Sequence, residues 1–259
     1  MESLNWHAAK AALEWQMELG AMDAVGDVPV DRYALAPKVA KPARAKAAPP
    51  PPPIEPVRNP RAEALEAAAR ARDLTSLRAA LQDFDGCALK RGARNFVFTE
   101  GLDAADLLVI GDAPGGLEER AGKPFQGAEG ALLDRMFAAI GRSRNADAPE
   151  TALLLATALP WRPPGDRPAS ADELSQIAPF LERLIAIAPA KAVILMGPSP
   201  CQALLGQSAL KELRGKWQVI ADKPVLPMRD PRHLLRRPMS KRNAWEDLKA
   251  MRNKLKEIT

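Results

Sequence analysis

Four short aliphatic runs are the feature that most limits what this chain can fold into. They cover residues 106–111, 152–157, 190–197 and 225–228, and helix-like stretches such as 130–140 and 172–187 lie between them. Strands that are apolar on both faces and alternate with helices form a mostly parallel sheet with helices on both sides. The sequence therefore predicts a three-layer α/β/α sandwich around a central, mostly parallel four-stranded sheet.

A ligand site in such a fold lies at the carboxyl ends of the strands. The segments directly after the four runs are 112–115, 157–162, 198–201 and 229–235. We expect these four segments to surround one cleft.

Composition divides the chain into three parts. Residues 1–34 are predicted to contain a helix, because Trp6, Leu13 and other apolar residues recur at helical spacing. Residues 35–60 are rich in Pro and Ala and include five consecutive prolines, which is typical of an extended linker. Residues 61–259 are predicted to form the folded domain. The apolar stripe makes the N-terminal helix a candidate docking element for a protein partner.

The chain carries 37 Lys and Arg against 32 Asp and Glu, a net charge of +5, but the charge is unevenly distributed. Residues 211–259 hold 14 basic and six acidic residues, so this segment is at +8 and the first 210 residues are at −3. A basic C-terminal segment favours a polyanionic partner, nucleic acid before a membrane surface. For residues 249–256 alone, a solvated helix surface is the simpler interpretation.

No apolar run is long enough to span a membrane, and the first residues lack the basic-then-apolar order of an export signal. We therefore expect a cytoplasmic protein, and we expect it to be a monomer. Cys87 and Cys201 are the two cysteines of the sequence. Two cysteines are too few for a disulfide framework or a four-cysteine metal site, so both are predicted to be reduced thiols.

A glycine-rich loop, Gly111-Asp112-Ala113-Pro114-Gly115, follows the first predicted strand. It presents backbone N–H groups and one carboxylate at the mouth of the cleft, although such a loop by itself is also typical of a turn or helix cap. Four more segments follow in order: Gly-Lys-Pro-Phe-Gln-Gly at 122–127, Trp-Arg-Pro-Pro-Gly-Asp-Arg at 161–167, Arg-Gly-Lys-Trp at 214–217 and Asp-Pro-Arg-His-Leu-Leu-Arg-Arg-Pro at 230–238.

In this order, the five segments resemble the motifs of the family 4 uracil-DNA glycosylases, the thermostable iron-sulfur class, whose patterns are GE(A/G)PG, G(R/K)PFVG, CRPPxNR, RGKW and HPSYLLRNP. The resemblance spans residues 85–255. It implies the uracil-DNA glycosylase fold and an N-glycosyl hydrolase that removes uracil, or another deaminated base, from DNA in base-excision repair.

The family holds a [4Fe-4S] cluster on four cysteines, and this chain keeps one of them. Cys87 stands at the first ligand position, whereas Lys90, Trp161 and Ile177 stand at the other three. One thiolate cannot hold such a cluster. We therefore predict no cluster, no metal and no other cofactor. Trp161 and Ile177 are expected to fill the space by packing, and Cys201 to be a small buried apolar residue.

Three pocket positions also depart from the family. Asp112 stands where the family has its first-motif glutamate, Thr157 replaces an asparagine that binds uracil, and Asp230 replaces a histidine. Breaking the C1′–N1 bond produces an oxocarbenium-like sugar and a uracil anion, so the enzyme needs a carboxylate near C1′ and donors near uracil O2. Asp112 is therefore the predicted catalytic residue, which orients water or stabilises the sugar cation.

The other two changes weaken the expected contacts with uracil. Thr157 offers one hydroxyl in place of an amide, so its contacts with the base are fewer or pass through water. An ionised Asp230 would oppose the developing anion. Three arrangements avoid this: Asp230 turns away and pairs with Arg229 or Arg232, Asp230 is protonated, or O2 relies on backbone N–H groups of the first loop.

The other pocket positions follow from the motifs. Phe125 is predicted to stack on a flipped base. Glu118 shapes the pocket near uracil C5, or it is a carboxylate favoured by the dipole of a helix N-terminus. The predicted substrate-binding set is Gly111, Ala113, Glu118, Phe125, Thr157 and Asp230.

Basic and hydroxyl residues around the cleft are candidates for DNA contacts. The predicted DNA-binding set is Ser199, Arg214, Gly215, Lys216, Arg232, His233, Leu234, Arg236 and Arg237. Leu234 and Leu235 have two interpretations, a wedge that fills the gap left by a flipped nucleotide or part of a helix core.

The functional hypothesis is a monofunctional, metal-free glycosylase that flips a deaminated base, chiefly uracil, out of DNA and cleaves its glycosidic bond. The alternative is a module of the same fold that binds lesion or abasic DNA but is weakly active or inactive, because three polar pocket positions differ from the family. A solute-binding α/β protein without DNA finds little support beside the basic C-terminal segment.

Overall fold

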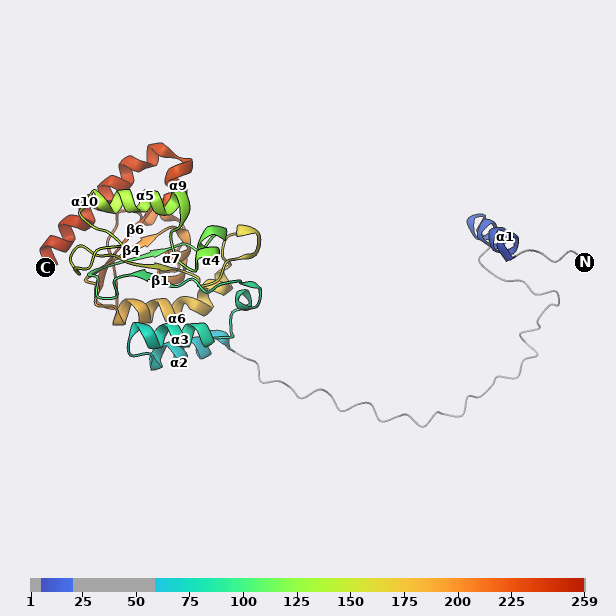
Figure 1. The fold of residues 1–259 in the computed structure, drawn as a ribbon, viewed down its shortest axis with the longest axis horizontal. Coiled ribbons are helices and arrows are strands. Elements are labelled where there is room, and N and C mark those ends of the chain that lie inside the picture. Colours follow the sequence, from blue (N-terminus) through green and yellow to red (C-terminus); the bar gives the residue numbers. More distant parts are fainter. Residues whose placement is uncertain (1–5, 21–58, 259) are drawn as a thin grey trace, which may run out of the picture. The chain divides into compact units, whose positions relative to one another are not determined.

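The computed structural model describes residues 6–20 and 59–258, and the chain divides into two compact units, Met1–Pro56 and Val57–Thr259. In the first unit a helix is present as expected, α1 (Trp6–Glu18) (Figure 1). Its large apolar side chains are exposed. The predicted linker lies outside the described residues except for its last two positions. None of the described helices has the length and apolar character needed to cross a lipid bilayer.

The second unit contains a mixed six-stranded sheet with the strand order β1-β3-β2-β4-β6-β5. Its strands are β1 (Thr99–Gly101), β2 (Leu107–Gly111), β3 (Leu154–Thr157), β4 (Ala192–Met196), β5 (Gln218–Ile220) and β6 (Lys223–Met228). The four central strands β3, β2, β4 and β6 are parallel, and they are the four strands predicted from the sequence. The short edge strands β1 and β5 were not predicted. Strand β1 pairs antiparallel with β3, and β5 pairs antiparallel with β6.

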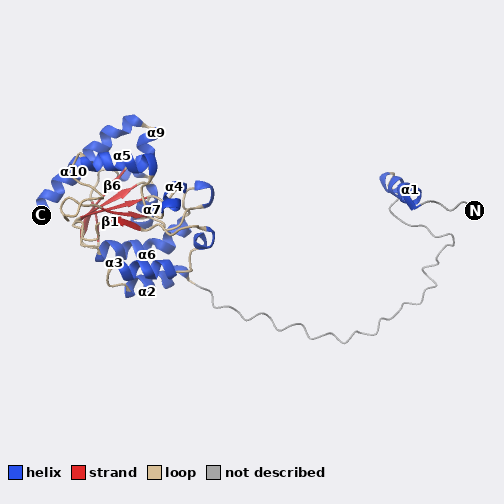
Figure 2. Cartoon of the chain, viewed as in Figure 1, coloured by secondary structure: helices blue, strands red, loops and turns tan. Residues whose placement is uncertain are grey.

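Helices cover both faces of this sheet, which confirms the predicted α/β/α sandwich (Figures 1 and 2). One face carries α6 (Ala171–Ile187), with α2 (Pro60–Arg70) and α3 (Leu74–Asp83) packed on α6. The other face carries α5 (Gly127–Ala138), α9 (Pro231–Arg236) and α10 (Lys241–Ile258). The shorter elements are η1 (Ala88–Gly92), α4 (Gly116–Ala121), η2 (Pro164–Asp166), α7 (Pro198–Leu205), α8 (Leu210–Leu213) and η3 (Pro238–Ser240).

Alternate residues of each central strand feed two separate hydrophobic cores. In β2, Leu108 and Ile110 pack on the α6 side, whereas Leu107 and Val109 pack on the side of α5 and α10. All of these side chains are fully buried, as expected for a parallel strand covered on both faces. The rigid sheet thereby fixes where its carboxyl-terminal loops lie.

The boundary between the two units gives a prediction for a truncated protein. Asn59 caps α2 by accepting a hydrogen bond from the Ala62 backbone N–H, and Pro60 is the first residue of that helix, so a cut has to lie before Asn59. Removing residues 1–56 is expected to leave the thermal unfolding midpoint within about 2 °C of the full chain. A much lower midpoint would show that the first unit contributes to the core.

Candidate active site

Three of the four predicted segments, those after β2, β4 and β6, line one cleft, whereas the segment 157–162 is absent from its described lining. The cleft has a volume of about 700 Å³ and is lined by residues from the loops after β2, β4 and β6 and from the segment 163–169. Eight residues of the predicted set line it: Asp112, Ala113, Ser199, Asp230, Arg232, His233, Arg236 and Arg237.

Asp112 is the first residue after β2, and its carboxylate is fixed by the neighbouring strand loop. Its Oδ1 accepts a hydrogen bond of 2.7 Å from the backbone N–H of Ser199, in the first turn of α7. Gly197 makes this approach possible, because a Cβ atom there would lie 2.6 Å from the Asp112 carboxylate and the glycine has φ +111°. The predicted DNA contact Ser199 therefore supports the carboxylate through its backbone.

The environment of Asp112 raises its pKa from the ordinary value of 3.8 to about 6. Burial is the main cause, and the nearby Asp230 carboxylate adds to it. The hydrogen bonds from Ser199 and the positive charge of Arg232 act in the opposite direction. A carboxyl group with a pKa near 6 is ionised at neutral pH and can accept a proton there, which is the requirement for a general base.

A smaller pocket lies beside Asp112 and contains the whole predicted substrate-binding set. It has space of about 10 Å³, which is room for roughly one water molecule. Its lining consists of Gly111, Asp112, Ala113, Glu118, Phe125, Glu129, Thr157, Asp230, Pro231 and Arg232. Below, this is called the base pocket.

Phe125 has an unusual backbone conformation that two side chains stabilise. Its φ is +52°, a left-handed value that a bulky residue rarely adopts without support. The Phe125 N–H donates to Glu118 Oε1 at 2.6 Å, and Glu118 Oε2 accepts from the Gly115 N–H at 2.7 Å. Glu118, in the first turn of α4, thus links the loop after β2 to the backbone of Phe125. Glu118 is a carboxylate in the first turn of a helix, and it also lines the base pocket, so both predicted roles stay open.

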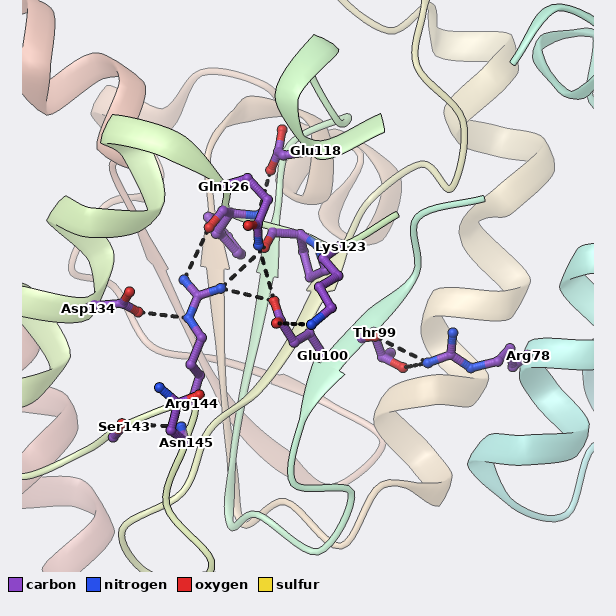
Figure 3. A network of polar contacts seen from close by, with 12 residues as sticks. Arg78, Thr99, Glu100, Glu118, Lys123, Gln126, Asp134, Ser143, Arg144 and Asn145 are labelled. Atoms are coloured by element: carbon purple, nitrogen blue, oxygen red, sulfur yellow. Dashed lines mark hydrogen bonds and ion pairs between the residues drawn. The ribbon is translucent and has the colours of Figure 1, made fainter. Parts of the chain in front are cut away.

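Arg144, which belongs to none of the sequence motifs, binds the carbonyl group of Phe125. Figure 3 shows its guanidinium between Asp134 and Glu100. Its guanidinium donates to the Phe125 carbonyl oxygen at 3.1 Å and is fixed by Asp134 at 2.8 Å and by Glu100 at 3.0 Å. Gly130 allows α5 to approach, because a Cβ atom there would lie 1.9 Å from the same carbonyl oxygen. The Phe125 ring is therefore positioned from both sides of its backbone.

Comparisons with known proteins show which family the chain belongs to. The description "Uracil DNA glycosylase superfamily" belongs to the family model that matches residues 98–249, more than half of the chain. The chain belongs to the uracil-DNA glycosylase superfamily. Similar proteins include type-4 uracil-DNA glycosylases of Sulfurisphaera tokodaii and Saccharolobus solfataricus, each 30% identical. The aligned regions cover 64% and 65% of this chain and 77% and 80% of theirs.

A third relative, the type-4 uracil-DNA glycosylase of Pyrobaculum aerophilum, is also 30% identical, over 56% of this chain and 67% of its own length. These relatives carry the name of the family whose motifs the sequence resembles.

In the candidate site, Thr157 does not present its hydroxyl hydrogen to the base pocket. The Thr157 hydroxyl donates to the carbonyl oxygen of Val97 at 2.9 Å, and the side chain is buried. Its oxygen keeps acceptor capacity, so Thr157 is a wall of the pocket that supplies no donor to a base.

Asp230 neither turns away nor pairs with Arg229. Its Oδ1 accepts a hydrogen bond of 3.0 Å from the backbone N–H of His233, which makes Asp230 the N-cap of α9. Burial raises its pKa, while this hydrogen bond and the Arg232 charge lower it. Arg229 instead approaches the His233 ring, with 3.1 Å between Arg229 Nη1 and His233 Nε2. The carboxylate of Asp230 remains in the base pocket as an acceptor.

The positions that hold an iron-sulfur cluster in family 4 do not fit one in this chain. Cys87, Trp161 and Ile177 are buried in the core on the α6 side, where Trp161 packs on Phe96 with 6.1 Å between ring centroids. Lys90 forms an ion pair with Asp85. Within the described residues no group of three or more His, Cys, Asp or Glu side chains could hold a metal ion. Burial also raises the pKa of the Cys87 thiol, which disfavours the thiolate form that binds metals.

Three residues of the predicted DNA-binding set, Arg214, Gly215 and Leu234, make contacts inside the protein. Arg214 donates to Asp247 Oδ1 at 2.6 Å and to a backbone carbonyl of α10, so its charge is neutralised internally. Gly215 has φ +73° and lies close to the same carboxylate. Leu234 is fully buried in the core, which rules it out as a wedge, whereas Leu235 is 40% exposed. Lys216 is exposed and stays a candidate.

Proposed function

We propose that this protein is a DNA glycosylase that hydrolyses the N-glycosidic bond of uracil in DNA. The observation that carries the proposal is the Asp112 carboxylate at the junction of a 700 Å³ cleft and a base pocket walled by Phe125. Membership in the uracil-DNA glycosylase superfamily and the names of the relatives support the same activity.

The proposed reaction needs little from the protein beyond placement and charge. The C1′–N1 bond breaks, its electron pair leaves with the base, and a sugar cation forms. Water then adds to C1′ and gives a proton to the Asp112 carboxylate, and the released base is protonated from solvent. The products are an abasic site and the free base. A negative charge near C1′ also stabilises the cation, so Asp112 serves both steps.

A gel assay on oligonucleotides tests the proposal. Single- and double-stranded substrates bearing uracil, hypoxanthine or xanthine are incubated with the full chain and then cleaved by alkali at abasic sites. We expect excision of uracil, with the other bases defining specificity. Specific binding to lesion or abasic DNA without excision of any base would overturn the enzymatic proposal and favour a binding module.

The proposed path of DNA follows the exposed cations of α9 and of the residue after it. Arg236 and Arg237 line the cleft and are exposed, so both are available to phosphate groups. Arg236→Ala and Arg237→Ala are each expected to reduce the slope of log affinity against log salt by about one, with little change in lesion preference. Arg70→Ala, on the outer helix α2, is the control and should leave the slope unchanged. A slope unaffected by either cleft variant would place DNA elsewhere.

The proposal assigns no catalytic task to α1. Its exposed apolar residues, including Trp6, Leu13 and Trp15, make it a candidate docking helix for a protein partner, with the second unit acting as a monomer on DNA. The truncated protein without residues 1–56 should therefore excise uracil from naked DNA at the rate of the full chain.

A further inference from the structure

The base pocket has an unusual charge content. Four carboxyl groups line it, those of Asp112, Glu118, Glu129 and Asp230, and Arg232 is the single cationic residue in this described lining. Arg232 lies in the first turn of α9, and its Nε donates to Glu129 Oε1 at 2.9 Å. A base that leaves as an anion would enter a pocket dominated by negative charge unless this guanidinium contacts it.

The two polar residues that replace the uracil-binding residues of the family do not offer a hydrogen-bond donor. Asp230 accepts the His233 N–H, and the hydroxyl hydrogen of Thr157 is donated to Val97. A guanidinium carries five N–H groups, and the Glu129 contact of Arg232 involves the one on Nε. The four N–H groups on the terminal nitrogens provide side-chain donors, which the other residues of the described pocket lining do not supply.

The location of the guanidinium suits this role. A Cβ atom placed on Gly115 would lie 3.3 Å from Arg232 Nη2, so the cation reaches across to the loop that begins with Asp112. The pocket holds about one water in this state, so an entering base has to displace lining atoms. The Arg232 side chain is 31% exposed and forms an ion pair with one carboxylate, that of Glu129. Its guanidinium can therefore shift to admit a base while its charge stays at the pocket.

We propose that Arg232 contacts the flipped base and stabilises the negative charge that collects on the base oxygens as the glycosidic bond breaks. Glu129 is the positioning residue that orients the guanidinium. The electron pair of the C1′–N1 bond passes to the base, Arg232 keeps its proton throughout, and the base anion is protonated by solvent after release. This inference rests on the proposed glycosylase function. It assigns the contact with the leaving base to Arg232 and not to residue 230.

The test compares bases that differ in how readily they leave as anions. Single-turnover excision of uracil and of 5-fluorouracil, the better leaving group, is measured with the full-length parent, Arg232→Met and Arg232→Lys. Arg232→Met is expected to slow uracil excision by about 10²–10³-fold, the typical effect of removing one donor to a developing anion. Fluorouracil excision should lose clearly less, and Arg232→Lys should recover part of the uracil rate.

Rates are compared on the alkaline plateau of each pH profile, because the Arg232 charge also lowers the pKa values of Asp112, Glu118 and Asp230. Asp166 and Glu129 are the other titratable groups that face this cation, and they are kept in every variant. Arg135→Met, on the exposed face of α5, is the matched control and should keep the parental rates. An equal loss for both bases, or a loss confined to DNA affinity, would overturn the inference while leaving the glycosylase function intact.

A binding measurement separates this inference from the proposed function. Calorimetry with free uracil and with 5-nitrouracil, which is largely anionic at neutral pH, requires no turnover. The parent should prefer the anionic base by about tenfold or more, and Arg232→Met should lose that preference. If the parent excises no base, the glycosylase proposal fails, and the same titration still decides whether Arg232 binds an anionic base. Equal affinity of the parent for both bases would overturn the inference.

Discussion

Asp112→Asn is expected to slow uracil excision by about 10²–10⁴-fold while leaving the affinity for uracil-containing DNA close to that of the parent. The asparagine keeps the shape of the side chain and an oxygen that can accept a hydrogen bond from the Ser199 N–H. In the parent this N–H donates to Asp112 Oδ1 at 2.7 Å. It removes the negative charge and the ability to accept a proton from water. Single-turnover rates and equilibrium DNA binding, measured on the same preparation, test the two halves of the expectation.

The pH dependence of the parent provides an independent check on Asp112. Because the pKa of this carboxyl is about 6, kcat/KM should fall as the pH drops below about 6, where the carboxylate becomes protonated. Asp112→Asn should lack this acidic limb in whatever activity it retains. Parental excision that survives Asp112→Asn, or a flat profile through pH 6, would transfer the role to backbone donors and other groups.

Protein stability shows whether a loss of activity is due to unfolding. The pKa of Asp112 is higher in the folded protein than its ordinary value of 3.8, so between about pH 4 and pH 6 the folded state holds a proton that the unfolded chain has released. The contribution of Asp112 to the folding stability of the parent therefore decreases as the pH rises through this window. Asp112→Asn has no such carboxyl, so its unfolding midpoint relative to the parent should increase from pH 4 to pH 7.

The central strands were predictable because each is a continuous aliphatic run. Residues 192–196, for example, are Ala-Val-Ile-Leu-Met and are buried at every position. The edge strands β1 and β5 have three residues each and mixed burial, so no pattern marks them. The turn between β5 and β6 consists of Ala221 and Asp222, both with positive φ, as in a tight hairpin. It lacks the Asn-Gly or Asp-Gly pair that makes such turns recognisable in a sequence.

The site was predictable to the extent that strand ends determine it. Asp112 directly follows β2, Thr157 ends β3 and Asp230 lies two residues after β6. The topology of a parallel sheet therefore brings them together. What the sequence could not give is the use of each side chain. The side chains of Thr157 and Asp230 form hydrogen bonds with backbone groups. Glu129 lines the pocket but belongs to none of the five motif segments.

Internal contacts of the predicted DNA face could not be predicted for a related physical reason. The Arg-Gly-Lys segment at 214–216 looked like a phosphate site, but Arg214 is paired with Asp247, which lies 33 residues later on α10. Leu234 and Leu235 are equivalent in sequence, and only the packing of α9 on the sheet decides that Leu234 is buried and Leu235 is exposed. Charge pairing and burial across long sequence separations are tertiary facts that local patterns do not encode.

Gly111→Ala is expected to reduce the efficiency of uracil excision by about 10- to 100-fold through Phe125. A Cβ atom at Gly111 would lie 2.3 Å from Phe125 Cζ, so the ring has to leave its position. The Phe125 backbone cannot follow, because Glu118 binds its N–H and Arg144 binds its carbonyl oxygen. Losing an aromatic platform for a base costs about 1–3 kcal/mol, which corresponds to this loss of rate.

Backbone preference alone would predict a different effect of Gly111→Ala on stability. Gly111 is the last residue of β2 and has no left-handed φ, so alanine would by itself be tolerated or slightly stabilising there. Crowding of the ring instead predicts about 1–3 kcal/mol of destabilisation. Gly92→Ala is the matched control, since no atom lies within 4 Å of the added Cβ, and it should match the parent in stability and rate.

Phe125→Leu should reduce the efficiency of uracil excision about as much as Gly111→Ala. Because both substitutions act on one ring, the double variant should lose little more than either single one. Full additivity would mean that Gly111 and Phe125 act on separate steps and that the ring is not the platform for the base.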